Sequence, residues 1–376
     1  MATRRIIAVS PDLAFGEVIA GVLAGPDRLV ERRTALGGIG PEPLALVVLH
    51  TGERSAADVV ALLARLPPHV PAIAIIPRTD LVLLVEVMRA SDQIHAVLVA
   101  EGLDHAELAG LAARILEGEA FGLEPFVTRQ ADLFEVRVGD YAGKAQCIDD
   151  VLAFAEATKV RRKYREMIGQ CLDEMLMNAL YDAPVDAAGR PLFAEVAPAD
   201  RKSLPHEHEA IVHYACDGIR FAIAVRDAFG RLERGTVLRY LHKCLHEEQQ
   251  IDRKAGGAGL GLYLMASSAS SVYFRVEPGR ATEAVCTFEL GGPRPRLLQF
   301  GFLTARDPRT APVASPPPTV PAANPPVEPA AHTRAAGADR ALTHVTQGPP
   351  RLLVIGLAAA IALVVAAIVL VATGAL

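Results

Sequence analysis

The sequence contains no tryptophan, and its five cysteines are scattered without any C-x-x-C pair. Zinc ribbons and thioredoxin-like redox sites need cysteines paired at short spacing, so neither class is indicated. The cysteines are therefore expected to be buried thiols of a protein in a reducing compartment. The net charge of −5 comes with no basic arm and no stripe of lysine and arginine, which argues against nucleic-acid binding.

Long hydrophobic runs are missing until residues 352–376, which contain neither a charged residue nor a proline. As a helix this run would be roughly 37 Å long, enough to cross a hydrocarbon core of ~30 Å with some tilt. We expect a single transmembrane helix over residues 352–374, and Arg351 directly before it favours a cytoplasmic flank. The chain would then be anchored in the inner (cytoplasmic) membrane by its C-terminus, with its folded domains in the cytoplasm.

Proline is concentrated in one segment before that run. Residues 293–350 hold 13 of the 27 prolines, together with many alanines and threonines. Such a composition cannot bury enough apolar surface to offset the entropy lost on ordering. Residues 293–350 are therefore predicted to be a disordered or polyproline-like linker.

The first 118 residues alternate between two periodicities. Continuous apolar runs typical of buried parallel strands occur at 4–10, 44–50, 72–77 and 96–100. Segments with helical spacing follow them at 11–24, 56–66, 82–91 and 105–118. This alternation predicts a doubly wound α/β sheet with right-handed crossovers. The order and length of the elements resemble a response-regulator receiver domain.

The receiver resemblance covers the scaffold and not the phosphotransfer chemistry. Receivers accept phosphate on an aspartate that ends the third strand, near an acidic pair after the first strand and a lysine after the fifth. In this sequence the run 44–50, which would correspond to the third strand of a receiver, ends in His50, and only Asp12 remains of the acidic pair. The run 96–100, which would correspond to the fifth strand, is followed by Glu101 where the lysine is expected. Because an aspartyl phosphate needs a carboxylate nucleophile and an acidic magnesium site, we interpret residues 1–118 as a pseudo-receiver that serves in docking.

Residues 121–292 have a different organisation. The predicted elements are a strand at 134–138, helices at 147–160 and 162–183, a hairpin at 210–227, helices at 236–248 and from 260, and a second hairpin at 271–290. Helices packed on one face of an antiparallel-type sheet form an α+β sandwich.

Three short motifs in this region suit a nucleotide site. Glu174 and Asn178 are four residues apart on a predicted helix, so both project from one face. An amide oxygen can bind Mg²⁺, and a carboxylate can orient or deprotonate an attacking group. Asp227 ends a strand, where a carboxylate can accept a hydrogen bond from a base, and Gly230 follows it. Four glycines crowd residues 256–261, and a glycine-rich loop that opens a helix can direct backbone N–H groups at phosphates.

These motifs, in this order, resemble those of the Bergerat-fold (GHKL) ATPase domain, which is shared by sensor histidine kinases, anti-sigma serine kinases, gyrase-type ATPases and Hsp90 chaperones. The E-x-x-x-N-A motif matches the N box, D-x-F-G matches the first glycine box imperfectly, and G-A-G-L-G-L matches the second. The resemblance implies that Asn178 holds Mg²⁺ and that Glu174 is the catalytic or water-positioning acid. It also implies ATP contacts from Asn178, Asp182, Asp227, Gly230, Gly257, Gly259, Leu260 and Gly261. Asp182 stands where many family members carry histidine or lysine.

Three functions are compatible with these motifs. A self-contained histidine kinase is rejected, because no histidine occurs between His105 and His206 to accept phosphate. The first reading is a membrane-anchored signalling protein that binds Mg·ATP and regulates a protein partner, with the lid at 231–255 ordered by nucleotide. The second is a serine/threonine kinase of the anti-sigma type that phosphorylates a partner. The third is a membrane scaffold without nucleotide. Enzymatic activity therefore stays open.

Overall fold

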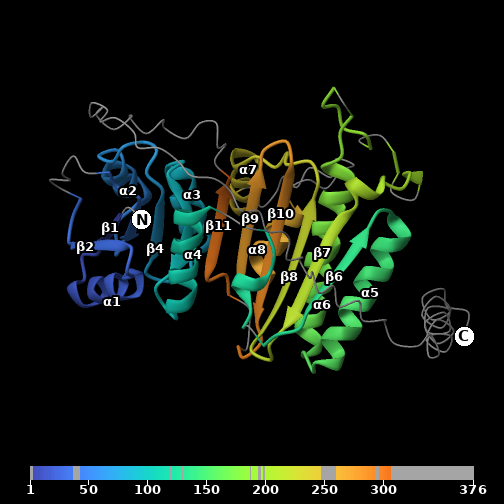
Figure 1. The fold of residues 1–376 in the computed structure, drawn as a ribbon, viewed down its shortest axis with the longest axis horizontal. Helices are drawn as coiled ribbons and strands as arrows, with labels where there is room; N and C mark the ends of the chain where they lie inside the picture. Colours follow the sequence, from blue (N-terminus) through green and yellow to red (C-terminus); the bar gives the residue numbers. More distant parts are fainter. Residues whose placement is uncertain are drawn as a thin grey trace, which may run out of the picture. The chain divides into compact units, whose positions relative to one another are not determined.

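The computed structural model describes residues 3–36, 43–118, 121–128, 130–186, 188–193, 196–197, 200–246, 260–292 and 296–305. Within these residues a single mixed sheet of eleven strands has the order β2-β1-β3-β4-β5-β11-β9-β10-β8-β7-β6 (Figure 1). The sheet has a parallel part from the N-terminal region and an antiparallel part from the region after residue 121.

The parallel part carries alternating strands and helices. In chain order they are β1 (Arg4–Val9), α1 (Leu13–Leu23), β2 (Arg28–Arg33), β3 (Leu46–His50), α2 (Ala56–Leu63), β4 (Ala72–Ile76), α3 (Leu81–Ala90), β5 (Ile94–Val99) and α4 (His105–Glu117). The strand order β2-β1-β3-β4-β5 is that of flavodoxin-like and CheY-like sheets. The N-terminal region is therefore a receiver-like domain, as the sequence predicts.

Local sequence explains why these elements form. Asp12, Ser55, Asp80 and Asp104 are N-caps whose side chains accept hydrogen bonds from backbone N–H groups of the first helical turn. Strands β3 and β4 are buried along their whole length, because helices cover both faces of the sheet. Buried residues of α1 and α4 pack on one face, and those of α2 and α3 pack on the other. The doubly wound arrangement expected from the sequence is thus observed.

The antiparallel part follows. Its elements are β6 (Leu133–Val138), α5 (Tyr141–Ala157), α6 (Arg162–Met177), a π-helical turn (Asn178–Asp182), β7 (Ala210–Cys216), β8 (Arg220–Asp227), α7 (Arg234–His246), α8 (Leu260–Ser268), β9 (Ser271–Glu277) and β10 (Ala281–Glu289). Buried side chains of α5, α6, α7 and α8 join one core cluster with one face of these strands. The predicted helix at 162–183 is therefore two elements, since α6 gives way to the π turn at Asn178.

Strand β11 (Gln299–Thr304) joins the two parts (Figure 1). It pairs antiparallel to β5 and parallel to β9. This segment belongs to the region predicted as a disordered linker, 293–350, and that expectation is corrected for residues 299–304. The reason is tertiary: five of its six residues are buried, because the strand lies between two sheet edges that exist only in the folded protein.

The predicted transmembrane helix at 352–374 and the remainder of the linker lie outside the described residues. In the part of the chain that the structure does describe, no helix is both long enough and apolar enough to span a membrane.

The strand pairing defines two ends of the sheet. Asp227 pairs with Thr282, Thr282 pairs with Val276, and Val276 pairs with Thr304, so these four residues mark one end, called here the Asp227 end. Because β11 runs antiparallel to β5, the last residues of β5 lie at the opposite end, called here the Val99 end. The predicted nucleotide motifs and the carboxyl edge of the receiver-like domain thus lie at opposite ends of the sheet.

Candidate functional site

The end of α6 presents the polar residues of the first motif. Glu174 is half-buried in the last turn of α6, and Asn178 is exposed where the π turn begins. The N–H group of Ala183 donates to the carbonyl of Asn178 at 2.9 Å, the five-residue spacing of a π-helix. Single π turns inside α-helices occur frequently at functional sites. Burial raises the pKa of Glu174, and the charge of Asp173 raises it further.

Asp227 ends β8 and is buried, with 8% of its surface exposed. Its Oδ1 accepts hydrogen bonds from the N–H groups of Phe229 at 2.7 Å and Gly230 at 3.1 Å. Burial raises the pKa of Asp227, although these two donors favour the carboxylate. The carboxyl group is therefore held in a fixed orientation at the sheet end where the sequence places an adenine-binding acid.

Gly230 has a structural reason to be glycine. Its φ is +63°, and a Cβ added there would lie 2.7 Å from the backbone nitrogen of Arg280. The N–H of Gly279 donates to the carbonyl of Gly230 at 3.1 Å, so the loop after Asp227 rests on the β9–β10 turn. Only glycine combines the left-handed backbone with this close approach.

The start of α8 lies against the end of α6. A Cβ added at Gly261 would lie 2.6 Å from the Cδ of Glu174, so the carboxyl group occupies the space that glycine leaves open. Leu260 is the first residue of α8. Gly257 and Gly259 of the same predicted glycine box lie outside the described residues.

The structure thus brings together Glu174 and Gly261, with Asn178 one turn beyond Glu174. Asp182 is the last residue of the π turn and is exposed. Neighbouring protein atoms still remove part of the solvent around its carboxyl group, which raises the pKa of Asp182. Asp227 lies at the same end of the sheet. Val138 pairs with Ala210, and the residue after Ala210 pairs with Arg226, so β6 ends and α5 begins near Asp227. Helix α5 therefore leads away from this end of the sheet, and α6 returns to it. The motifs from a helix end, a strand end and a helix start therefore gather at the Asp227 end.

Two cations near this site come from elements that no motif includes. Lys144 of α5 is 6% exposed and forms an ion pair with Asp173, and its charge favours the ionised form of Glu174. The guanidinium of Arg201 lies 4.2 Å from the centroid of the Tyr181 ring, and its charge favours the ionised form of Asp182. Sequence reasoning missed both residues, because each reaches the site from a segment with no recognisable pattern.

The residues present fit a magnesium-bound polyphosphate in two respects. In the described residues no group of three or more His, Cys, Asp or Glu side chains could hold a metal ion. The amide oxygen of the exposed Asn178 could supply one ligand to a magnesium ion, with phosphate oxygens and water as the others, which is the usual arrangement of Mg²⁺ with nucleotides. The buried Tyr181 hydroxyl and Arg201 Nη1 have no hydrogen-bond partner among the described residues, although such groups usually have one.

The carboxyl edge of the receiver-like domain contains a buried pair. The hydroxyl of Ser10 lies 2.9 Å from Nδ1 of His50, and the ring of Phe15 lies edge-on to His50 at 4.6 Å. Burial lowers the pKa of His50, which favours the neutral imidazole. His50 is therefore a hydrogen-bonded core histidine at the position where receivers carry the phosphate-accepting aspartate.

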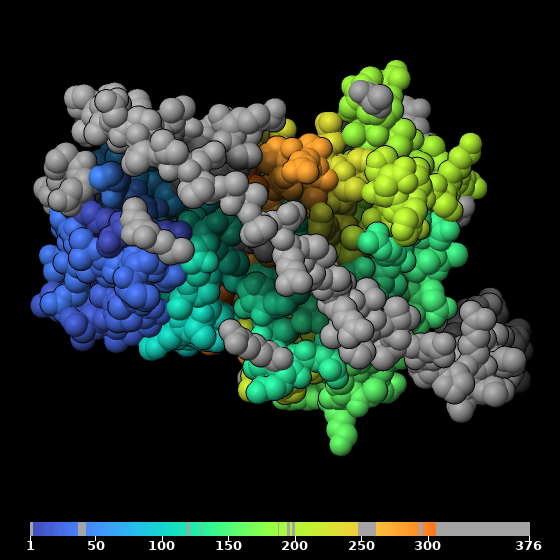
Figure 2. All heavy atoms as spheres, in the orientation of Figure 1, coloured from blue at the N-terminus to red at the C-terminus, as the bar shows by residue number. Residues whose placement is uncertain are grey.

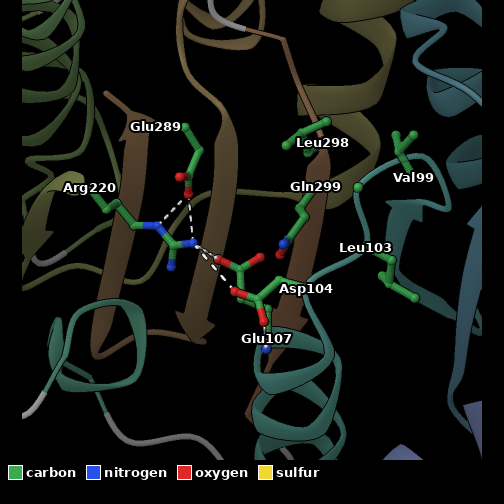
Figure 3. Close-up of a pocket in the computed structure, with 9 residues that line it drawn as sticks. Val99, Leu103, Asp104, Glu107, Arg220, Glu289, Leu298 and Gln299 are labelled. Carbon is green, nitrogen blue, oxygen red and sulfur yellow. Dashed lines mark hydrogen bonds and ion pairs between the residues drawn. The ribbon is translucent and has the colours of Figure 1, made fainter. Parts of the chain in front are cut away.

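A cavity of about 240 Å³ opens at the Val99 end, where α4 faces β8 and β10 (Figure 3). The guanidinium of Arg220 points toward three carboxylates: Glu107 at 2.5 Å, Glu289 at 2.6 Å and Asp104 at 3.7 Å. Burial raises the pKa of Glu107 to about 7, while Arg220 opposes the rise. None of the predicted nucleotide residues lines this cavity.

Comparisons with known proteins give partial similarities. No protein-family model matches the sequence, and no curated protein matches it. The structure is similar to the response regulator DrrB of Thermotoga maritima, at 16% identity over 31% of this chain and 53% of DrrB, with a TM-score of 0.27. It is also similar to a CheY-like receiver domain protein from Methanospirillum hungatei JF-1, at 15% identity over 31% of this chain and 95% of that chain, with a TM-score of 0.27.

A third similarity is to a chain of the SiaB-SiaC complex from Pseudomonas aeruginosa, at 14% identity over 41% of this chain and 88% of that chain, with a TM-score of 0.28. The alignment spans about half the length of DrrB. Because every TM-score is below 0.5, the receiver-like description depends on the strand order within this chain.

Proposed function

We propose that the protein is a signalling regulator that binds Mg·ATP at the Asp227 end of its sheet and acts on a protein partner. The observation that carries the proposal is the contact between Glu174 and Gly261. It brings the end of α6 against the first turn of α8, at the sheet end where Asp227 is buried. A motif match by chance would not be expected to bring these residues to one place.

Each residue has a role that follows from its position. Asn178 is exposed and presents an amide oxygen suited to Mg²⁺. Asp227 holds a carboxyl group fixed by two backbone donors, and this group can accept a hydrogen bond from the amino group of adenine. Helix α8 begins at Leu260, and a helix start can offer backbone N–H groups and the positive end of the helix dipole to phosphates. Bound Mg·ATP would supply a phosphoryl group for transfer in a kinase, or would be the ligand that a switch detects.

Phosphotransfer to a serine or threonine of the partner is the second candidate. The raised pKa of Glu174 favours it, because a general base is most effective when its pKa approaches the working pH. The two candidates differ in outcome: a kinase transfers label from ATP to a protein, whereas a switch changes only its affinity for the partner.

The receiver-like domain is proposed to connect the site to its signal. Helix α7, which lies within the predicted lid segment 231–255, packs against α3 of the receiver-like domain. A partner docked on that domain could therefore influence the lid. Residues 352–374 are proposed to hold the protein at the inner membrane, on the strength of their uninterrupted apolar sequence.

The decisive experiment is a titration of the full chain in detergent with ATP, with and without Mg²⁺. Saturable binding that needs Mg²⁺ and is lost in Asn178→Ala supports the proposal. Gln170→Ala is the matched control, because Gln170 is also an exposed carboxamide on α6. Absence of saturable binding to the unaltered protein would overturn it. Incubation with radiolabelled ATP and cell extract then separates kinase from switch, and membrane fractionation of the full chain against residues 1–350 tests the anchor.

A further inference from the structure

The Asp227 end is rich in negative charge, which creates a difficulty for an anionic ligand. Asp173, Glu174 and Asp182 all lie on the last turns of α6 and the π turn. Burial raises the pKa of Glu174, and the charges of Asp173 and Asp182 raise it further. A magnesium ion compensates only part of the charge of a polyphosphate, so the site needs further cations. Lys144 is a cation whose charge acts on Glu174, but it is already paired with Asp173.

Arg201 is the second cation, and its position is set by packing. Its guanidinium lies 4.2 Å from the centroid of the Tyr181 ring and 5.9 Å from that of Phe193. Its Nε donates to the carbonyl of Val196 at 2.7 Å. These contacts hold the charged group beside the π turn, although Arg201 follows that turn by nineteen residues in the sequence. The yellow-green region of the surface in Figure 2 includes this segment.

The hydrogen bonding around Arg201 is incomplete. Tyr181 is 4% exposed, and neither its hydroxyl nor Nη1 of Arg201 has a hydrogen-bond partner among the described residues. Buried donors without partners are uncommon and costly, at about 1–3 kcal/mol each by general experience. The neighbouring Asp182 is exposed to solvent.

We propose that Arg201 contacts the phosphates of the bound nucleotide and makes affinity depend on phosphate number. This inference rests on the nucleotide binding proposed above. Arg201 brings positive charge beside Asp182 from another segment of the chain. Its guanidinium lies on the ring of Tyr181, within the π turn that begins at Asn178, the residue proposed to hold Mg²⁺.

The test uses a variant that keeps the packing and removes the charge. Arg201→Met preserves contact with the Tyr181 and Phe193 rings, and Arg201→Lys restores charge without the planar fork. Arg190→Met is the matched control, because Arg190 lies in the same segment but is exposed and paired with Asp186. Each variant is titrated with Mg·ATP, Mg·ADP and adenosine, and its thermal unfolding is recorded to confirm that it is folded.

A charged hydrogen bond to phosphate predicts that Arg201→Met weakens Mg·ATP binding roughly tenfold to hundredfold, with a smaller loss for Mg·ADP and none for adenosine. Arg201→Lys should recover part of the loss, and Arg190→Met should bind as the unaltered protein does. Unchanged Mg·ATP affinity in a folded Arg201→Met overturns the inference while the proposed function stands. An equal loss for adenosine also overturns it, since the residue would then act through the fold. If the unaltered protein binds no nucleotide, both proposals fall.

Discussion

Arg234 of α7 and Asp92, just beyond the end of α3, form an ion pair with Nη1 and Oδ1 2.8 Å apart. The same guanidinium donates to the carbonyls of Ser91 at 3.1 Å and Ile94 at 3.0 Å. Arg234 therefore ties the helix that precedes the predicted glycine box to the C-terminal end of a receiver-domain helix. A cation near the last carbonyls of a helix also interacts favourably with the helix dipole.

Replacing Arg234 with alanine should destabilise the protein by about 1–3 kcal/mol, because buried carbonyls of the α3–β5 connection lose their donor. The measurement is the free energy of unfolding from urea denaturation. Asp92→Ala should have a smaller effect, since its side chain is 99% exposed and the carbonyl contacts remain. Arg239→Ala is the control on the same helix, because Arg239 is exposed. Equal stability of Arg234→Ala and Arg239→Ala would show that the contact contributes little.

Stability should depend on pH through Glu107, whose side chain is 14% exposed. Its pKa is about 7 in the folded protein against an ordinary value of 4.5, so the folded state holds the proton more tightly than the unfolded state. The free energy of unfolding should then fall as pH rises from 4.5 to 7, by up to about 3 kcal/mol, and change no further above pH 7.

The variant Glu107→Gln should lack this part of the pH dependence, because glutamine resembles the protonated acid and does not titrate. Glu53→Gln is the control, since Glu53 is an exposed carboxylate. The measurement is urea denaturation at pH 5, 6, 7 and 8. An identical pH profile for the unaltered protein and Glu107→Gln would mean that the ion pair with Arg220 keeps Glu107 charged throughout.

Gly230→Ala should be strongly destabilising, by at least about 2 kcal/mol, because the added methyl meets backbone atoms of the β9–β10 turn at a positive φ. Gly218→Ala separates the two causes. Gly218 has a φ of +85°, but a Cβ there would meet nothing within 4 Å. Its cost should therefore be only the roughly 1 kcal/mol of the backbone conformation. Comparable unfolding free energies for the two variants would rule out the close approach at Gly230.

Arg275 and Glu283 form an ion pair on neighbouring strands, and their side chains are 1% and 0% exposed. Gly122 connects to both: its N–H donates to Oε1 of Glu283 at 3.0 Å, and its carbonyl accepts from Arg275 at 2.7 Å. Glu283→Ala should cost about 3–5 kcal/mol, because it leaves a buried guanidinium uncompensated.

The double variant Arg275→Met with Glu283→Ala should cost less than the sum of the two single variants, since no buried charge remains. A double-mutant cycle by urea denaturation measures this difference directly. Additive effects would indicate that the two side chains act independently, which their contact makes unexpected.

Much of the fold follows from local sequence. The apolar runs that form β1, β3, β4 and β5 and the helical spacing between them predict a parallel, doubly wound sheet, because each pattern is contained within one window of the chain. The N-cap residues mark helix starts for the same reason. The spacing of the motifs also predicts a nucleotide site, and of its residues the structure brings Glu174 and Gly261 into contact.

Other features depend on residues that meet only after folding. Strand β11 pairs with β5, about two hundred residues earlier in the chain, and with β9, about thirty residues earlier. A local reading of its proline-rich surroundings misses these partners, and the prediction of disorder was therefore wrong for this strand. Lys144 and Arg201 bring positive charge to the site from segments without a motif. Sequence alone determined most strands and helices of the receiver-like part, since their patterns are encoded locally. The tertiary structure decided how the two parts join and which cations neighbour the acids, since distance through space is independent of distance along the chain.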